Sequence, residues 1–350
     1  MKNLLTVVFA FALLVVPTVA MGQELNDSQE PGSVLVFPKF LRGAVTTEQG
    51  NLARTEIEIS VTCPSGVTCV DNLGVILRAH WVCPGSIFPP AACRETDFRL
   101  ATTVRGSLYF NPEGTGVAPF NVIVPPAPCN GGYLIVWAVN SAGQPIKFDG
   151  LIGDAILREG PDSASAYNAI PIQASSVLAT GAPVVLAADG ALVFDGGPGR
   201  YKAATGTVTG TVRYDRIATQ TQAPIQTSLT LLTLDVRSND FNFPTVVDLD
   251  FFSTNEALFS TFTFFVCWEE VRLAAIDPAL NENFMGRKGL VQSTEAEKVP
   301  FGGIADTAGP VTLLGLIETN EFSLAGPVAR GYMYSMSNDS RPVPTRFLPR

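Results

Sequence analysis

The chain has 350 residues, a net charge of −9 and a charged fraction of only 16%. An acidic protein is poorly suited to phosphate backbones or anionic membranes, so we expect no nucleic-acid partner. An apolar fraction of 46% excludes a disordered chain. The 31 glycines and 26 prolines are typical of many short strands joined by tight turns.

The N-terminus has the three parts of a secretory signal peptide. Lys2 supplies the positive end, residues 4–16 are almost wholly apolar, and Ala20-Met21-Gly22 supplies small residues for cleavage. The apolar run is shorter than the roughly 20 residues that a membrane helix needs. We therefore expect residues 1–22 to be a signal peptide and the mature chain to be secreted or periplasmic, without a membrane span. An uncleaved anchor helix is the alternative.

All six cysteines follow this leader, and an even number in an exported chain predicts disulfides. The pairs Cys63–Cys69 and Cys83–Cys93 each enclose a Pro/Gly turn, so we expect both to close locally. Cys129–Cys267 is then the remaining pair and joins the two halves of the chain. A metal site on these cysteines is disfavoured because no C-x-x-C motif occurs and the chain has one histidine. We expect no cofactor.

Period-two alternation is the main structural signal. Ile57, Ile59 and Val61 share one face of a predicted strand, and polar residues occupy the other. An apolar run over 132–139 predicts a central strand. The expected strands cover 33–40, 55–63, 74–83, 98–110, 132–139, 204–214, 227–236, 246–252, 258–273, 289–299, 311–319 and 332–337.

Residues 144–182 are less regular and mark a soft boundary. Because Ala and Ser gather there, we expect short helices over 151–157 and 163–174. Asp277-Pro278 predicts the start of another short helix, ending near Phe284.

These patterns predict an all-β fold, either an antiparallel β-sandwich or a barrel, with two packed β domains and a few short helices. The predicted units are a disulfide-containing N-terminal β domain over 33–157, a C-terminal β domain over 185–340 and an extended tail over 341–350.

His80 is the only histidine, so a Ser-His-Asp or Cys-His mechanism would have to use it. No G-x-S-x-G elbow occurs, and oxidised cysteines provide no thiol nucleophile. We interpret His80 as an exposed residue in the middle of a strand and assign no catalytic residue.

Several carboxylates attract attention. Asp248 and Asp250 are two apart on a predicted strand, about 7 Å apart, which approaches the spacing of an inverting glycosidase. A solvated strand face is the favoured interpretation. Glu269 and Glu270 are adjacent and should face opposite ways unless a bulge intervenes, and Arg272 shares the face of Glu270 and is its expected ion-pair partner.

Three further features of the sequence can be explained without a binding site. An oxygen-rich turn suits calcium but lacks the EF-hand spacing. The Gly-rich segment over 195–200 is interpreted as a hairpin turn, and the three tryptophans are expected to pack in the core. The turn contains Asp235, Asn239, Asp240 and Asn242, and the tryptophans are Trp81, Trp137 and Trp268.

The favoured function is an exported, non-enzymatic β protein with a structural, adhesive or ligand-binding role at the cell surface or in the periplasm. Its partner is expected to be a protein or a glycan. The alternatives are a carbohydrate-active hydrolase that uses Asp248 and Asp250, and a calcium-stabilised, adhesin-like domain.

Overall fold

The computed structural model confirms the all-β prediction: antiparallel sheets pack together, and no described strands close into a barrel. The residues described are 24–45, 52–70, 73–114, 117–118, 122–159, 164–236, 243–254, 257–300, 309–324, 328–336, 343 and 345–349. The predicted signal peptide lies outside them. Two short helices occur in these ranges, α1 (Leu273–Ile276) and α2 (Glu282–Met285).

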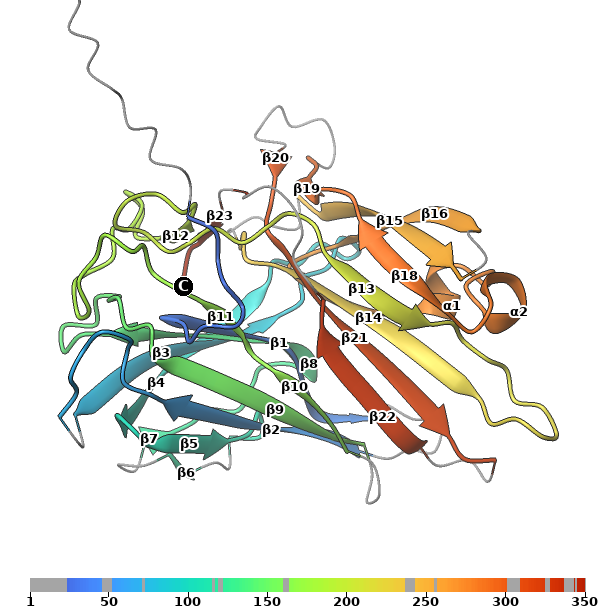
Figure 1. The fold of residues 1–350 in the computed structure, drawn as a ribbon, viewed down its shortest axis with the longest axis horizontal. Helices are drawn as coiled ribbons and strands as arrows, with labels where there is room; N and C mark the ends of the chain where they lie inside the picture. Colours follow the sequence, from blue (N-terminus) through green and yellow to red (C-terminus); the bar gives the residue numbers. More distant parts are fainter. Residues whose placement is uncertain are drawn as a thin grey trace, which may run out of the picture.

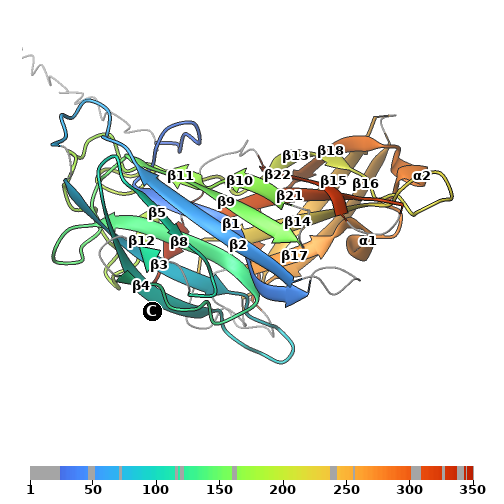
Figure 2. The ribbon, with the colours of Figure 1, turned by 90° about the horizontal axis from the view of Figure 1, so that it is seen from below.

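A nine-stranded antiparallel sheet organises the first half of the chain, in the order β10-β9-β2-β1-β8-β3-β4 (Figures 1 and 2). β11 also pairs with β1, and β5 pairs with β2. The strands are β1 (Val34–Val45), β2 (Leu52–Val61), β3 (Gly74–Cys83), β4 (Arg94–Thr103), β5 (Ser107–Phe110), β8 (Gly131–Val139), β9 (Leu151–Glu159), β10 (Ala164–Asn168) and β11 (Ile170–Ile172). β8 is buried on both faces between β1 and β3, as a central strand should be.

Two sheets form a sandwich in the second half (Figure 1). One has six strands, in the order β13-β18-β15-β19-β20 with β16 paired to β15, and the other has the order β17-β14-β21-β22. Their facing side chains form one core, which includes Leu231, Leu249 and Ile317. The strands are β13 (Thr209–Arg213), β14 (Ile225–Thr233), β15 (Thr245–Ser253), β16 (Leu258–Phe265), β17 (Trp268–Arg272), β18 (Lys288–Ser293), β19 (Glu297–Lys298), β20 (Gly309–Pro310), β21 (Leu313–Phe322) and β22 (Val328–Ser335).

Two small strand pairs complete the fold. β6 (Val117–Ala118) pairs with β7 (Val122–Ile123), and β12 (Leu192–Phe194) pairs with β23 (Thr345–Phe347). Through β23, the end of the chain packs into a core that also holds Trp137 of β8 and Leu232 of β14. Residues far apart in the sequence therefore share one apolar cluster.

The helices expected over 151–157 and 163–174 are wrong, because these segments form β9, β10 and β11. Pairing of β9 with β2 along nine residues buries Ala155 and Leu157, which outweighs the weak helix preference of the segment. The helix expected at Asp277 is also misplaced. Asn281 is the N-cap of α2, where its side chain accepts the backbone N–H groups of Asn283 and Phe284.

The long strand predicted over 258–273 is divided into β16 and β17 at Cys267. This residue has a φ of 65°, a left-handed conformation that is uncommon outside glycine. The chain thereby crosses from the six-stranded to the four-stranded sheet.

The disulfide prediction is correct for one pair and wrong for two. Cys63 bonds Cys69 as expected, but the other bonds are Cys83–Cys129 and Cys93–Cys267. Cys83 lies opposite Arg94 in the β3–β4 ladder, so Cys93 is one step out of phase with it. Adjacent positions point to opposite faces, and Cys83 and Cys93 accordingly belong to different core clusters.

The loop lengths predict unequal contributions to stability. The Cys93–Cys267 bond spans 174 residues and Cys63–Cys69 spans 6. Chain entropy gives about 5 and about 2 kcal/mol for these loops. We expect the Cys93→Ser/Cys267→Ser double variant to lose about 3 kcal/mol more free energy of unfolding in urea than Cys63→Ser/Cys69→Ser. Equal losses would contradict the assignment.

Candidate functional site

The single histidine lies inside the protein. The His80 side chain is fully buried, its ring stacks on Trp137 with centroids 4.9 Å apart, and its Nδ1 lies 3.2 Å from the Glu95 carboxylate. The expected exposure is wrong because β3 is covered on both faces, by an apolar cluster that contains Trp81 and Phe110 on one side and by Phe347 of β23 on the other. A substrate in solvent cannot reach this ring in the structure described.

Asp248 and Asp250 lie on the outer face of β15, while Val247, Leu249 and Phe251 are buried, as the alternation predicts. The Asp250 carboxylate accepts a hydrogen bond of 2.6 Å from the Ser260 hydroxyl on β16. An open sheet face supplies no walls to hold a sugar between the carboxylates. This location does not favour the hydrolase alternative, which stays a prediction.

The tryptophans are buried and the Gly-rich segment forms a turn, as the sequence predicts. All three tryptophans are buried, and the indole N–H of Trp268 donates to the Pro38 carbonyl at 2.7 Å. The Gly-rich segment is a turn, in which Arg200 forms an ion pair with Asp195 and two glycines have positive φ.

Most of the proposed calcium turn lies outside the described residues. Within them, no three metal-ligating side chains gather at one place. Neither of the two described helices has the length and apolar character of a membrane span.

A buried ion cluster joins the two halves of the chain. The Lys39 ammonium of β1 is almost inaccessible and donates to the carboxylates of Glu270 on β17, at 2.7 Å, and Glu318 on β21. Tyr167 donates its hydroxyl to the Lys39 carbonyl. Burial lowers the pKa of Lys39, but the two carboxylates raise it by more, so Lys39 stays charged. The expected Glu270–Arg272 pair is therefore wrong.

A groove of about 410 Å³ opens beside Glu270. Its walls are the loop 84–88, the end of β16 with Val266, and the start of β17. The aromatic rings of Phe88 and Phe264 are 74% and 51% exposed. The Gly85 N–H donates to the Val266 carbonyl at 3.2 Å, and a Cβ on Gly85 would lie 2.6 Å from the Val266 side chain. The loop therefore needs glycine to approach the strand this closely.

Glu269 carries the charge of this groove. Its carboxylate accepts a 3.2 Å hydrogen bond from the Thr263 hydroxyl, and no described cation pairs with it. Burial raises the pKa of Glu269, and the Thr263 hydrogen bond opposes the rise. Both Glu269 and Glu270 line the groove although adjacent residues of a strand face opposite ways, because β17 pairs with β14 alone among the described strands and its other edge is reached from both faces.

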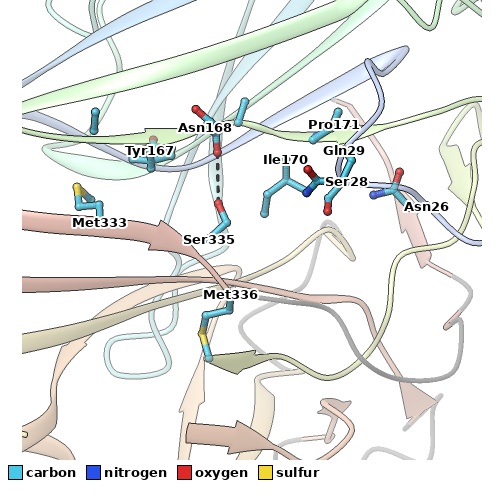
Figure 3. Close-up of a pocket in the computed structure, with 12 residues that line it drawn as sticks. Asn26, Ser28, Gln29, Tyr167, Asn168, Ile170, Pro171, Met333, Ser335 and Met336 are labelled. Atoms are coloured by element: carbon cyan, nitrogen blue, oxygen red, sulfur yellow. Dashed lines mark hydrogen bonds between the residues drawn. The ribbon is translucent and has the colours of Figure 1, made fainter. Parts of the chain in front are cut away.

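A second cavity, of about 450 Å³, lies between β10 and β22 (Figure 3). Side-chain amides and two methionines line it, and the Ser335 hydroxyl donates to the Asn168 carbonyl across it at 3.3 Å. The described residues that line it include Asn26, Gln29, Asn168, Met333 and Met336, and none of them carries a carboxylate, ammonium or imidazole. The groove beside Glu269 is the stronger candidate for recognition because it combines charge with exposed aromatic rings.

Comparisons with known proteins give no family. No protein-family model matches the chain, and no curated protein matches it. A solved structure entitled "Structure of infectious bursal disease virus Gx strain" aligns with 93% of this chain and 82% of that chain, at 11% identity and a TM-score of 0.15. A likeness at this level carries no argument about fold or function.

Removing the central charge of the ion cluster should be costly. Lys39→Met leaves the carboxylates of Glu270 and Glu318 without their cation, and breaking a buried pair costs about 3–5 kcal/mol. The matched control is Arg158→Met, which removes the solvent-exposed guanidinium that pairs with Glu56 and should lower the free energy of unfolding far less. Urea unfolding of both variants measures the difference, and equal losses would refute the structural role of Lys39.

Proposed function

We propose that this chain is an exported, non-enzymatic binding protein with a structural or adhesive role at the cell surface or in the periplasm. Its groove beside Glu269 takes a positively charged, partly apolar group of a protein or glycan partner. The observation that carries this proposal is the carboxylate of Glu269, which no described cation pairs with and which lines the same groove as two exposed aromatic rings.

The chemistry of the groove supports a cationic group. An ammonium or guanidinium gains a charge-assisted hydrogen bond from a partly desolvated carboxylate. Aromatic faces attract the same cations, and the apolar stem of a Lys or Arg side chain packs on the rings. Glu270 does not compete for the ligand because Lys39 already neutralises it.

Two further observations support the absence of catalysis and the exported compartment. The only imidazole is buried against Trp137, and the paired aspartates of β15 lie on an open face. Three disulfides are typical of oxidising compartments, and the leader pattern of residues 1–22 agrees with export.

A binding screen tests the proposal. The purified, fluorescently labelled chain is applied to an array of glycans and peptides that differ in charge. We expect the ligands retained to carry ammonium or guanidinium groups, with affinity confirmed by titration calorimetry. Glu269→Gln should weaken the best ligand about tenfold or more, because a hydrogen bond to a charged group contributes about 1.5–3 kcal/mol.

The matched control is Glu297→Gln, which neutralises an exposed carboxylate on β19, outside the groove. This variant should bind as the parent chain does. Retention of anionic ligands alone, or equal binding by Glu269→Gln, would overturn the proposal. Glycan cleavage that Asp248→Asn abolishes would instead establish the hydrolase.

A further inference from the structure

Strand β16 is an edge strand without the usual protection. Its sequence, Leu-Phe-Ser-Thr-Phe-Thr-Phe-Phe, contains no charged residue and no proline over eight positions. Among the described residues, it pairs with β15 alone. Edge strands normally carry lysine, proline or a bulge, which prevent pairing with a further strand.

The register with β15 shows which backbone groups face the open side. The Ser253 N–H donates to the Ala257 carbonyl, one step before the Phe252–Leu258 pair. Because hydrogen-bonded pairs alternate along an antiparallel ladder, odd-numbered residues of β16 bond β15. The N–H and C=O groups of Leu258, Ser260, Phe262 and Phe264 therefore point to the open side.

The side chains of the same four residues lie on the outer face of the sheet. Leu258, Phe262 and Phe264 are 58%, 62% and 51% exposed, whereas most apolar residues of the sandwich are buried. A strand added to this edge would satisfy the backbone groups and cover part of these side chains at the same time.

We propose that β16 pairs antiparallel with β16 of a second copy of this chain, about a twofold axis at Thr261. This register places Leu258 opposite the partner's Phe264 and Ser260 opposite the partner's Phe262, so the two symmetry-related Leu258–Phe264 pairs lie with Phe262 on one continuous outer face. It also directs every outward N–H of these residues to an outward carbonyl. The strand is thus complementary to itself.

The charges of this acidic chain do not oppose the pairing. Among the described residues, the carboxylates on the outer face of the neighbouring strand β15 are Asp248 and Asp250, which lie opposite Phe262 and Ser260. In the dimer, three interstrand spacings, about 14 Å, separate Asp248 from the partner's Asp250. The Debye length at physiological salt is about 8 Å, so the repulsion is largely screened.

The area involved predicts a weak, concentration-dependent dimer. An aromatic side chain buries about 150–250 Å² in full, so the exposed parts of Leu258, Phe262 and Phe264 supply about 300 Å² per copy. A standard stable interface buries about 800 Å² per partner. We therefore expect monomer and dimer to exchange as the protein concentration changes.

Cysteine cross-linking tests the register. All six native cysteines are oxidised, so an introduced cysteine is the only thiol. Thr261→Cys places the two thiols opposite each other at the twofold axis, in a non-hydrogen-bonded pair about 4.5 Å apart at Cα, within disulfide range. Under mild oxidation it should form a covalent dimer at least tenfold faster than Ser260→Cys. A Ser260→Cys chain that dimerises equally fast, or no covalent dimer from either, would overturn the proposal.

Sedimentation velocity over a range of concentrations provides an independent test. The parent chain should shift from monomer to dimer, and Phe262→Lys, which places a cation on the shared edge, should stay monomeric. The matched control is Phe284→Lys on α2, where the ring is 74% exposed but is not part of strand β16; it should dimerise as the parent chain does. A parent chain that is monomeric at every concentration would overturn the proposal and leave the edge to a strand from another protein.

Discussion

The disulfide between Cys93 and Cys267 is the constraint on which the arrangement of the chain depends. It joins the segment between β3 and β4, in the nine-stranded sheet, to the point where β16 becomes β17. The residue at that point adopts a left-handed conformation, and the chain passes from one sheet of the sandwich to the other. The groove is lined by residues 84–88 of the β3–β4 connection and by residues on either side of Cys267, so the crosslink joins the two segments that form its walls.

The buried ammonium of Lys39 complements this covalent link. It occupies the region where β1, β17 and β21 meet, and it neutralises one of two adjacent carboxylates. Of the carboxylates among the described residues that line the groove, Glu269 is therefore left without a cation. The groove and the open edge of β16 share Phe264, so recognition of a partner and association between copies would use neighbouring parts of one surface.

Alternation in the sequence predicted most of the strands because burial on one face imposes it directly. Alternation did not predict the segments whose secondary structure is decided by pairing with distant strands. The segments over 151–157 and 163–174 have few strong strand formers and become strands through their neighbours. Cysteine spacing suggested that Cys83 and Cys93 meet, but spacing alone does not reveal the phase of the two strands. The sequence singled out two residues of the candidate site, Glu269 and Glu270, but not the buried Lys39 that pairs with Glu270. A lone lysine within the apolar run over 34–41 was the available signal for a buried charge.

Peptide mapping of the unreduced protein by mass spectrometry tests the central constraint most directly. After digestion without reduction, we expect linked peptides that contain Cys93 with Cys267 and Cys83 with Cys129. A linked peptide that joins Cys83 to Cys93 would contradict it, because those two side chains belong to opposite faces of the sheet.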